Sequence, residues 1–219
     1  TYIVSHNLRA PVANIIGLSH LLNILDLDDT EYEEIKLALH TAITTLDNTI
    51  IDLNHILEVS SKANERSEQV SFSALIADIT LSLNHLIESE RAIVSYHFNE
   101  TEEMVGIKSY LYSIFYNLIL NGIKYHRPGI DPIINVSGCK TATGTIIRFH
   151  DNGKGIDEKN LKSLFGLYKR FDTDVEGKGM GLFMVKMQVE SMGGSINVES
   201  EPEKGSTFII EFPDLTSKY

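Results

Sequence analysis

Two glycine-rich runs in the second half of the sequence could bring bare backbone close to an anionic ligand. The first, Asp151–Ile156, follows a strand-like run, so we expect the Asp151 carboxylate at a strand end, where it could accept a hydrogen bond from an amino group. The second, Gly177–Leu182, opens a helix-like stretch. A glycine costs about 1 kcal/mol inside a helix, so this run indicates a need for close approach, and phosphate at a helix N-terminus is the usual cause. Either run alone is weak evidence, because surface turns look similar.

A polar stripe interrupts an otherwise apolar helix predicted over residues 108–125. Asn117, Asn121 and Lys124 are spaced i, i+4 and i+7, so they share one face of that helix. A carboxamide oxygen suits Mg²⁺, and a lysine one turn further on could reach a phosphate group. The alternative is helix capping together with a solvated face.

The stretch between the glycine runs is basic, although the chain as a whole is acidic. Residues 159–170 contain four positive side chains and no acidic one, whereas the formal net charge of the chain is −11. Phe165, Tyr168 and Phe171 are interleaved with these charges. The pattern predicts a lid that closes over a polyphosphate. A solvated basic loop would explain the charges but not the aromatic residues.

These features occur in an order that resembles the ATP-binding domain shared by histidine kinases, DNA gyrase, Hsp90 and MutL. The resemblance rests on the asparagine helix, the two glycine runs and Leu164–Phe171 between them. It implies ATP and Mg²⁺ as cofactors, with Asn121 as the metal ligand, Asp151 at the adenine amino group and Thr207 near the adenine. The nucleotide-binding residues that it implies are Asn117, Asn121, Lys124, Tyr125, Asp151, Gly153, Gly155, Ile156, Lys169, Arg170, Lys178, Gly179, Gly181, Leu182 and Thr207.

Asn117 stands where the ATP-hydrolysing relatives have a glutamate that activates water. A carboxamide cannot act as a general base. The sequence therefore predicts a catalytic site that holds ATP without transferring its phosphate to water, so that another group must be the acceptor.

The N-terminal stretch Ser5–Pro11 resembles the phosphoacceptor box of histidine kinases. The resemblance implies that His6 is phosphorylated, with Asn7 beside it where many members have an acidic residue that orients the imidazole. Ala10 stands where members that dephosphorylate their partner have threonine or asparagine, so we expect little phosphatase activity. Ala10, Ala13 and Gly17 extend the helical face of His6 with little side-chain bulk, which would let another domain approach.

Together these features predict a protein-histidine kinase of two-component signalling. It would phosphorylate itself on His6 and pass the phosphoryl group to an aspartate in the receiver domain of a response regulator. One alternative is a serine kinase or ATPase of the same superfamily. Another is a dimeric scaffold with a vestigial ATP site.

Two amphipathic helices are predicted in the first sixty residues. Apolar residues recur in steps of three and four from Leu8 to Leu25 and again from Ile35 to Leu57, and Thr30 with Glu33 fits a capping box for the second helix. We assign residues 1–62 to a helical hairpin and residues 63–68 to a linker. Such a hairpin buries little surface alone, so we expect a homodimeric four-helix bundle. The alternative is packing on the rest of the same chain.

Residues 69–219 have the alternating pattern of an α/β sandwich, which makes the whole chain α+β with a mixed, Bergerat-type sheet. The expected strands are 70–72, 92–98, 132–139, 144–151, 195–200 and 207–212, and the expected helices are 73–87, 108–125 and 181–192.

Bulk properties exclude several other classes. The net charge argues against nucleic acid as a partner, the single Cys139 permits no internal disulfide, and the eight histidines show no metal-ligand spacing. No apolar run approaches the roughly 20 residues that span a bilayer. We expect a cytoplasmic fragment of a longer protein, such as a membrane receptor with an upstream sensor domain.

Overall fold

The computed structural model describes residues 2–24, 28–61, 66–98, 101–172 and 179–214. The chain divides into two compact units, Thr1–Lys62 and Ala63–Tyr219. Among the helices described, none is both long enough and apolar enough to cross a membrane.

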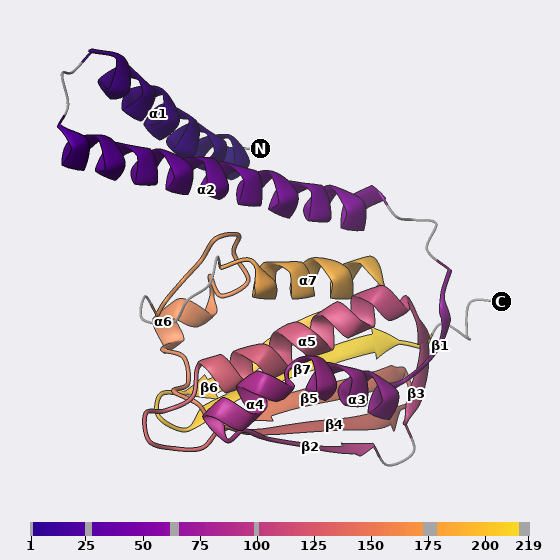
Figure 1. Cartoon of the computed structure of the whole chain (residues 1–219). Coiled ribbons are helices and arrows are strands. Elements are labelled where there is room, and N and C mark those ends of the chain that lie inside the picture. The colour runs from indigo at the N-terminus through magenta and orange to yellow at the C-terminus, as the bar shows by residue number, and fades with distance from the viewer. Residues whose placement is uncertain (1, 25–27, 62–65, 99–100, 173–178, 215–219) are drawn as a thin grey trace. The chain divides into compact units, whose positions relative to one another are not determined.

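The first unit consists of α1 (Tyr2–Ile24) and α2 (Asp29–Ser61), which contact each other (Figure 1). The contact buries only part of the apolar stripes. Leu18 and Leu39 are half-buried, but Val12 is 39% exposed and Ile43 is 50% exposed. The pair therefore leaves apolar surface uncovered.

The second helix begins two residues earlier than the predicted capping box. Asp28 Oδ1 accepts hydrogen bonds from the backbone N–H groups of Thr30 (2.9 Å) and Glu31 (2.8 Å), and the Glu31 carboxylate accepts from the N–H of Asp28 (3.2 Å). This reciprocal arrangement is a capping box with Asp28 in the capping position. The assignment to Thr30 and Glu33 was wrong because aspartate is as good a cap as threonine.

The second unit is built on a five-stranded mixed sheet with the order β2-β4-β5-β7-β6. Its strands are β2 (Ile93–Phe98), β4 (Ile133–Thr141), β5 (Gly144–Asp151), β6 (Ser195–Glu201) and β7 (Gly205–Pro213). Strands β2 and β4 are parallel, and the other neighbours are antiparallel. The α+β class and the mixed sheet are confirmed. A separate antiparallel ribbon pairs β1 (Glu68–Ser71) with β3 (Glu103–Gly106).

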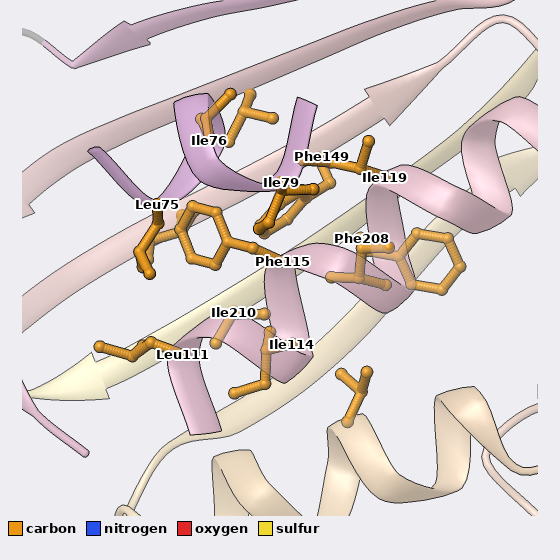
Figure 2. Close-up of a cluster of buried hydrophobic side chains, with 14 of the residues drawn as sticks. Leu75, Ile76, Ile79, Leu111, Ile114, Phe115, Ile119, Phe149, Phe208 and Ile210 are labelled. Atoms are coloured by element: carbon orange, nitrogen blue, oxygen red, sulfur yellow. The ribbon is translucent and has the colours of Figure 1, made fainter. Parts of the chain in front are cut away.

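Helices cover one face of this sheet, as Figure 1 shows. They are α3 (Phe72–Ser82), α4 (Asn84–Glu90), α5 (Lys108–Lys124) and α7 (Gly181–Ser191). The core lies between α5 and the sheet, where Phe115 and Ile119 meet Phe149 of β5 and Ile210 of β7 (Figure 2). Helix α5 thus fixes its own polar residues relative to the ends of β5 and β7.

Three elements differ from the predictions. The stretch predicted as one helix over 73–87 is two helices separated at Leu83. The strand β3 and the short helix α6 (Glu158–Leu161) were not predicted. Strand 144–151 and the start of the helix at Gly181 agree with the prediction.

Candidate functional site

Asp151 ends β5 and lies half-buried below the glycine turn Asp151–Ile156. Its Oδ1 accepts hydrogen bonds from the backbone N–H groups of Gly153 (2.8 Å) and Ser206 (3.2 Å). Burial raises the pKa of the Asp151 carboxyl above its usual range, and these two N–H groups oppose that effect only in part. The other carboxylate oxygen can therefore serve a ligand donor in a sheltered place.

The glycines of this turn allow three backbone segments to meet. A Cβ atom on Gly153 would stand 2.6 Å from the carbonyl oxygen of Tyr125, and one on Gly155 (φ +69°) would stand 2.0 Å from that of Glu201. Gly205 (φ +107°) is pressed equally closely against Asp151, at 1.9 Å from its carbonyl oxygen. Bare backbone is required here as predicted, but the atoms that come close belong to the protein itself.

Hydrogen bonds hold this turn from both sides. The N–H of Lys154 donates to the carbonyl of Tyr125 (3.0 Å), and the N–H of Glu203 donates to the carbonyl of Lys154 (2.7 Å). Arg127 donates from Nε to the carbonyl of Asn152 (3.0 Å) and from Nη1 to that of Glu203 (2.7 Å). Arg127 was not predicted, because no local pattern reveals a partner 76 positions away.

Ser206, and not Thr207, lies beside Asp151. The register pairs Asp151 with Ser206 and His150 with Thr207. Because side chains alternate along a strand, Thr207 points to the opposite face, where its hydroxyl is hydrogen-bonded to His150 Nδ1 (2.9 Å). Counting strand parity back from the buried Phe208 would have identified Ser206, which is 6% exposed.

Asn117, Asn121 and Lys124 lie on α5, as the spacing predicted, but their side chains have different surroundings. Asn117 Nδ2 donates to the carbonyl of Ser113 (2.8 Å). The half-buried Asn121 makes no side-chain hydrogen bond to the described residues, so its carboxamide is available to a ligand. Lys124 is exposed, and Tyr125 follows the helix as its C-terminal cap.

The start of α7 is pressed against α5. A Cβ atom on Gly181 would stand 2.7 Å from Asn117 Oδ1. Gly179 (φ +71°) is similarly close to the backbone of Lys169, where a Cβ would meet the carbonyl oxygen at 2.6 Å. The capping residue Met180 supplies no side-chain hydrogen bond to the helix, which leaves first-turn N–H groups for an anion.

The predicted lid, residues 159–170, is only partly packed. Leu164 is buried and Phe165 touches the core, together with Ile156 and Leu182. Lys169 and Arg170 are exposed, and Phe171 is 41% exposed. Lys178, a predicted ligand of the same region, lies outside the described residues.

An ion pair joins this segment to the glycine turn. Lys154 Nζ lies 2.6 Å from Asp172 Oδ2. Next to them, the pKa of the Tyr125 hydroxyl is raised by burial and by the charge of Asp172, while Arg170 and Lys154 act in the opposite direction. The phenol is thus surrounded by charged groups of both signs.

The predicted phosphoacceptor belongs to the other unit. His6 and Asn7 lie within α1, but the structure does not describe their side chains. Ala10 and Ala13 are exposed, and a Cβ atom built on Gly17 would meet no atom within 4 Å. The face that continues from His6 is therefore accessible in this chain.

Comparison with known proteins supports this arrangement of elements. The family described as histidine kinase-, DNA gyrase B- and HSP90-like ATPase matches residues 106–216. A curated relative, the sensor protein SrrB of Staphylococcus aureus (strain N315), is 28% identical over 221 aligned residues, which include 96% of this chain and 37% of the relative. The chain thus spans 37% of the length of the curated relatives that it matches.

Solved histidine kinases have the same fold. The kinase AdeS of Acinetobacter baumannii superposes with a TM-score of 0.67 at 17% identity, over 96% of this chain and 98% of that one. The kinase ThkA, in a complex with the response regulator TrrA, has a TM-score of 0.67 at 21% identity, over 100% of this chain and 62% of that one. Full-length ShkA, in a complex with AMPPNP, has a TM-score of 0.66 at 19% identity, over 97% of this chain and 45% of that one.

The family match covers half of the chain, and the chain therefore belongs to the histidine kinase-, DNA gyrase B- and HSP90-like ATPase family. Within that family, its ATP-binding domain resembles those of the sensor protein SrrB and the solved histidine kinases.

Proposed function

We propose that this chain binds ATP with Mg²⁺, transfers the γ-phosphoryl group to His6, and then passes it to an aspartate of a response regulator. The observation that carries the proposal is that α5, which bears the available Asn121 carboxamide, lies against Asp151 through Gly122 and against the uncapped start of α7 through Asn117. Asp151, Asn121 and the start of α7 differ in chemistry and suit the adenine amino group, the metal and the phosphates respectively.

At the adenine end, Asp151 would accept from the amino group, and Ser206 would replace Thr207 as the β7 residue beside it. The half-buried Ile156 and Leu182 would supply apolar contact to the base. Because burial raises the pKa of Asp151, the carboxylate gains from a donor that shields it from the apolar surroundings.

At the phosphate end, the backbone of Gly179 and Gly181 would approach the phosphates. Lys124, Tyr125, Lys169, Arg170 and Lys178 would complete this side. Asn121 fits Mg²⁺ because its oxygen is not engaged by the described residues and because Mg²⁺ takes few protein ligands beside phosphate oxygens. The bound ion would neutralise charge that develops on the transferred group.

Asn117 would protect ATP from hydrolysis. Its amide group is already bound to Ser113, and its oxygen is packed against Gly181. It therefore holds α5 and α7 together and offers no base to a water molecule. This supports a site that keeps ATP for a protein acceptor.

For transfer, a neutral His6 imidazole would attack the γ-phosphorus in line through Nε2 while the bond to the bridging oxygen of ADP breaks. Asn7 would hold the Nδ1 proton and fix the tautomer, without the charge of an acidic residue. The small, exposed Ala10 and Ala13 support close approach of the ATP-binding domain or a receiver domain. With Ala10 in place, we expect little phosphatase activity.

The proposed assembly is a homodimer. Val12, Ile43 and Ile50 remain 39–50% exposed on the two helices, and a second copy would cover them in a four-helix bundle. We assign residues 1–62 to dimerisation and phosphoacceptance, 63–68 to a linker and 69–219 to catalysis. We further propose a cytoplasmic location, downstream of a sensor domain, and a response regulator as partner, as in the ThkA complex with TrrA.

Incubation with radiolabelled ATP and Mg²⁺ tests the proposal. We expect acid-labile, alkali-stable label in the wild type, and loss of label in His6→Gln and Asn121→Asp. His20→Gln is the matched control, since His20 is an exposed histidine of the same helix. Alkali-labile label would favour a serine kinase, free phosphate without label an ATPase, and nucleotide binding with neither product a scaffold.

A further inference from the structure

The ion pair between Lys154 and Asp172 connects the glycine turn with the end of the basic segment. The two residues are 18 positions apart, and their side chains are 34% and 22% exposed. A pair that is sheltered to this extent is screened less by water and salt than a surface pair.

The lysine end of the pair is fixed. The N–H and the carbonyl of Lys154 are both engaged, by Tyr125 and Glu203, and Gly155 next to it fits against Glu201 without room for a side chain. The ammonium group is therefore presented from a backbone that cannot shift without breaking several contacts.

At the aspartate end of the pair, the two residues that precede Asp172 are exposed. Between α6 and Asp172, the backbone hydrogen bonds include single turns such as Gly166 N–H to Ser163 (3.0 Å) and Lys169 N–H to Gly166 (3.3 Å). Phe171 is 41% exposed and Arg170 is exposed. Burial therefore does little to place Arg170 and Phe171.

We propose that Lys154 is a positioning residue, which holds Asp172 and thereby places Arg170 at the phosphate end of the pocket. This rests on the proposed ATP site. Arg170 is two residues before Asp172, so anchoring the aspartate restricts the arc that the guanidinium can sample. The pre-ordered segment then loses less conformational entropy when nucleotide binds.

The alternative role for Lys154 is direct contact with a phosphate, and a double-mutant cycle separates the two. For a positioning role, Lys154→Gln and Asp172→Asn each weaken binding of an ATP analogue by about fivefold, an estimate for a half-buried ion pair, and the double variant is no weaker than either. For a direct contact, Asp172→Asn leaves binding unchanged or tightens it, and the proposal is overturned. Lys204→Gln is the control, because its pair with Glu201 is exposed.

Hydrogen exchange of residues 158–172 in the nucleotide-free protein gives a second readout. Both single variants should speed exchange there equally, and the charge swap Lys154→Asp with Asp172→Lys should restore protection. Faster exchange that the swap does not reverse would also overturn the proposal. If the wild type binds no nucleotide, the proposed function fails, and the exchange experiment still decides whether the ion pair orders the segment.

Discussion

Gly181 and Asn117 are so close that a single methyl group at residue 181 would stand 2.7 Å from the Asn117 oxygen. This contact joins the second glycine run to the asparagine helix, which are 64 residues apart in the sequence. It gives Gly181 a packing role in addition to the proposed approach to phosphate.

Gly181→Ala should displace the Asn117 side chain and weaken ATP-analogue binding by about tenfold. Rotating Asn117 away breaks its bond to Ser113, at a cost of about 1 kcal/mol, while alanine regains up to about 1 kcal/mol in a helix. Stability should therefore change little. Calorimetric titration and urea unfolding measure the two effects, and unaltered binding would contradict the prediction.

Gly17→Ala is the matched glycine variant on the other unit. No atom lies within 4 Å of a Cβ built there, so alanine should raise the stability of the first unit by up to about 1 kcal/mol. ATP-analogue binding should stay at the wild-type value. Thermal unfolding followed by circular dichroism measures the change.

Asp151→Asn should make stability less dependent on pH. Burial raises the pKa of Asp151 in the folded protein, so the folded state holds the proton more tightly than the unfolded chain does. Stability then falls as pH rises from the usual aspartate value through the raised one. The asparagine variant lacks this fall, because its oxygen can accept the same N–H groups without charge. The free energy of unfolding in urea, measured for both proteins at about pH 3.5 to 7, tests this.

Asp151→Asn should also bind the ATP analogue at least about tenfold more weakly. The variant loses the proposed hydrogen bond from the adenine amino group to a charged carboxylate, which is worth about 1.5–3 kcal/mol. Thr207→Val is the control on the opposite face of β7. Equal losses in the two variants would contradict the assignment of the adenine end to Asp151 and Ser206.

Ser200→Ala should loosen the glycine turn. Its Oγ accepts from the N–H of Ile156 (2.9 Å) and donates to the carbonyl of Gly205 (2.9 Å). Alanine leaves both groups without this partner, at an expected cost of about 1–3 kcal/mol. Urea unfolding of the whole chain measures this loss of stability. A loss below a few tenths of a kcal/mol would contradict the role of Ser200 in holding the turn.

Asp28→Ala should destabilise α2 by about 1 kcal/mol, since two N–H groups lose their acceptor. Thr30→Ala should change stability much less. If Thr30→Ala lowers the thermal stability more than Asp28→Ala does, the capping residue is Thr30 after all.

Patterns confined to one element were predictable from the sequence. The apolar periodicity of α5 and the alternation in β5 gave their bounds closely, since each pattern is set by the residues of the element itself. The polar stripe Asn117, Asn121 and Lys124 followed from the same periodicity.

Features that depend on distant partners were not predictable. Strand β3 is four residues long and pairs with β1, more than thirty residues earlier. The break at Leu83 has no proline or glycine to mark it. Arg127 and the pair Lys154–Asp172 depend on how the chain folds back on itself, which local propensity does not encode.

Contacts with the glycine turn and with Arg127 fix the length of the turn between β6 and β7. Glu203 binds both Lys154 and Arg127 through its main chain, and Glu201 and Gly205 touch the turn on either side. An inserted or deleted residue there would shift the hydrogen-bonding groups by one position and displace Asp151 from β7. Loop engineering that is tolerated in most surface hairpins should therefore abolish nucleotide affinity in this one.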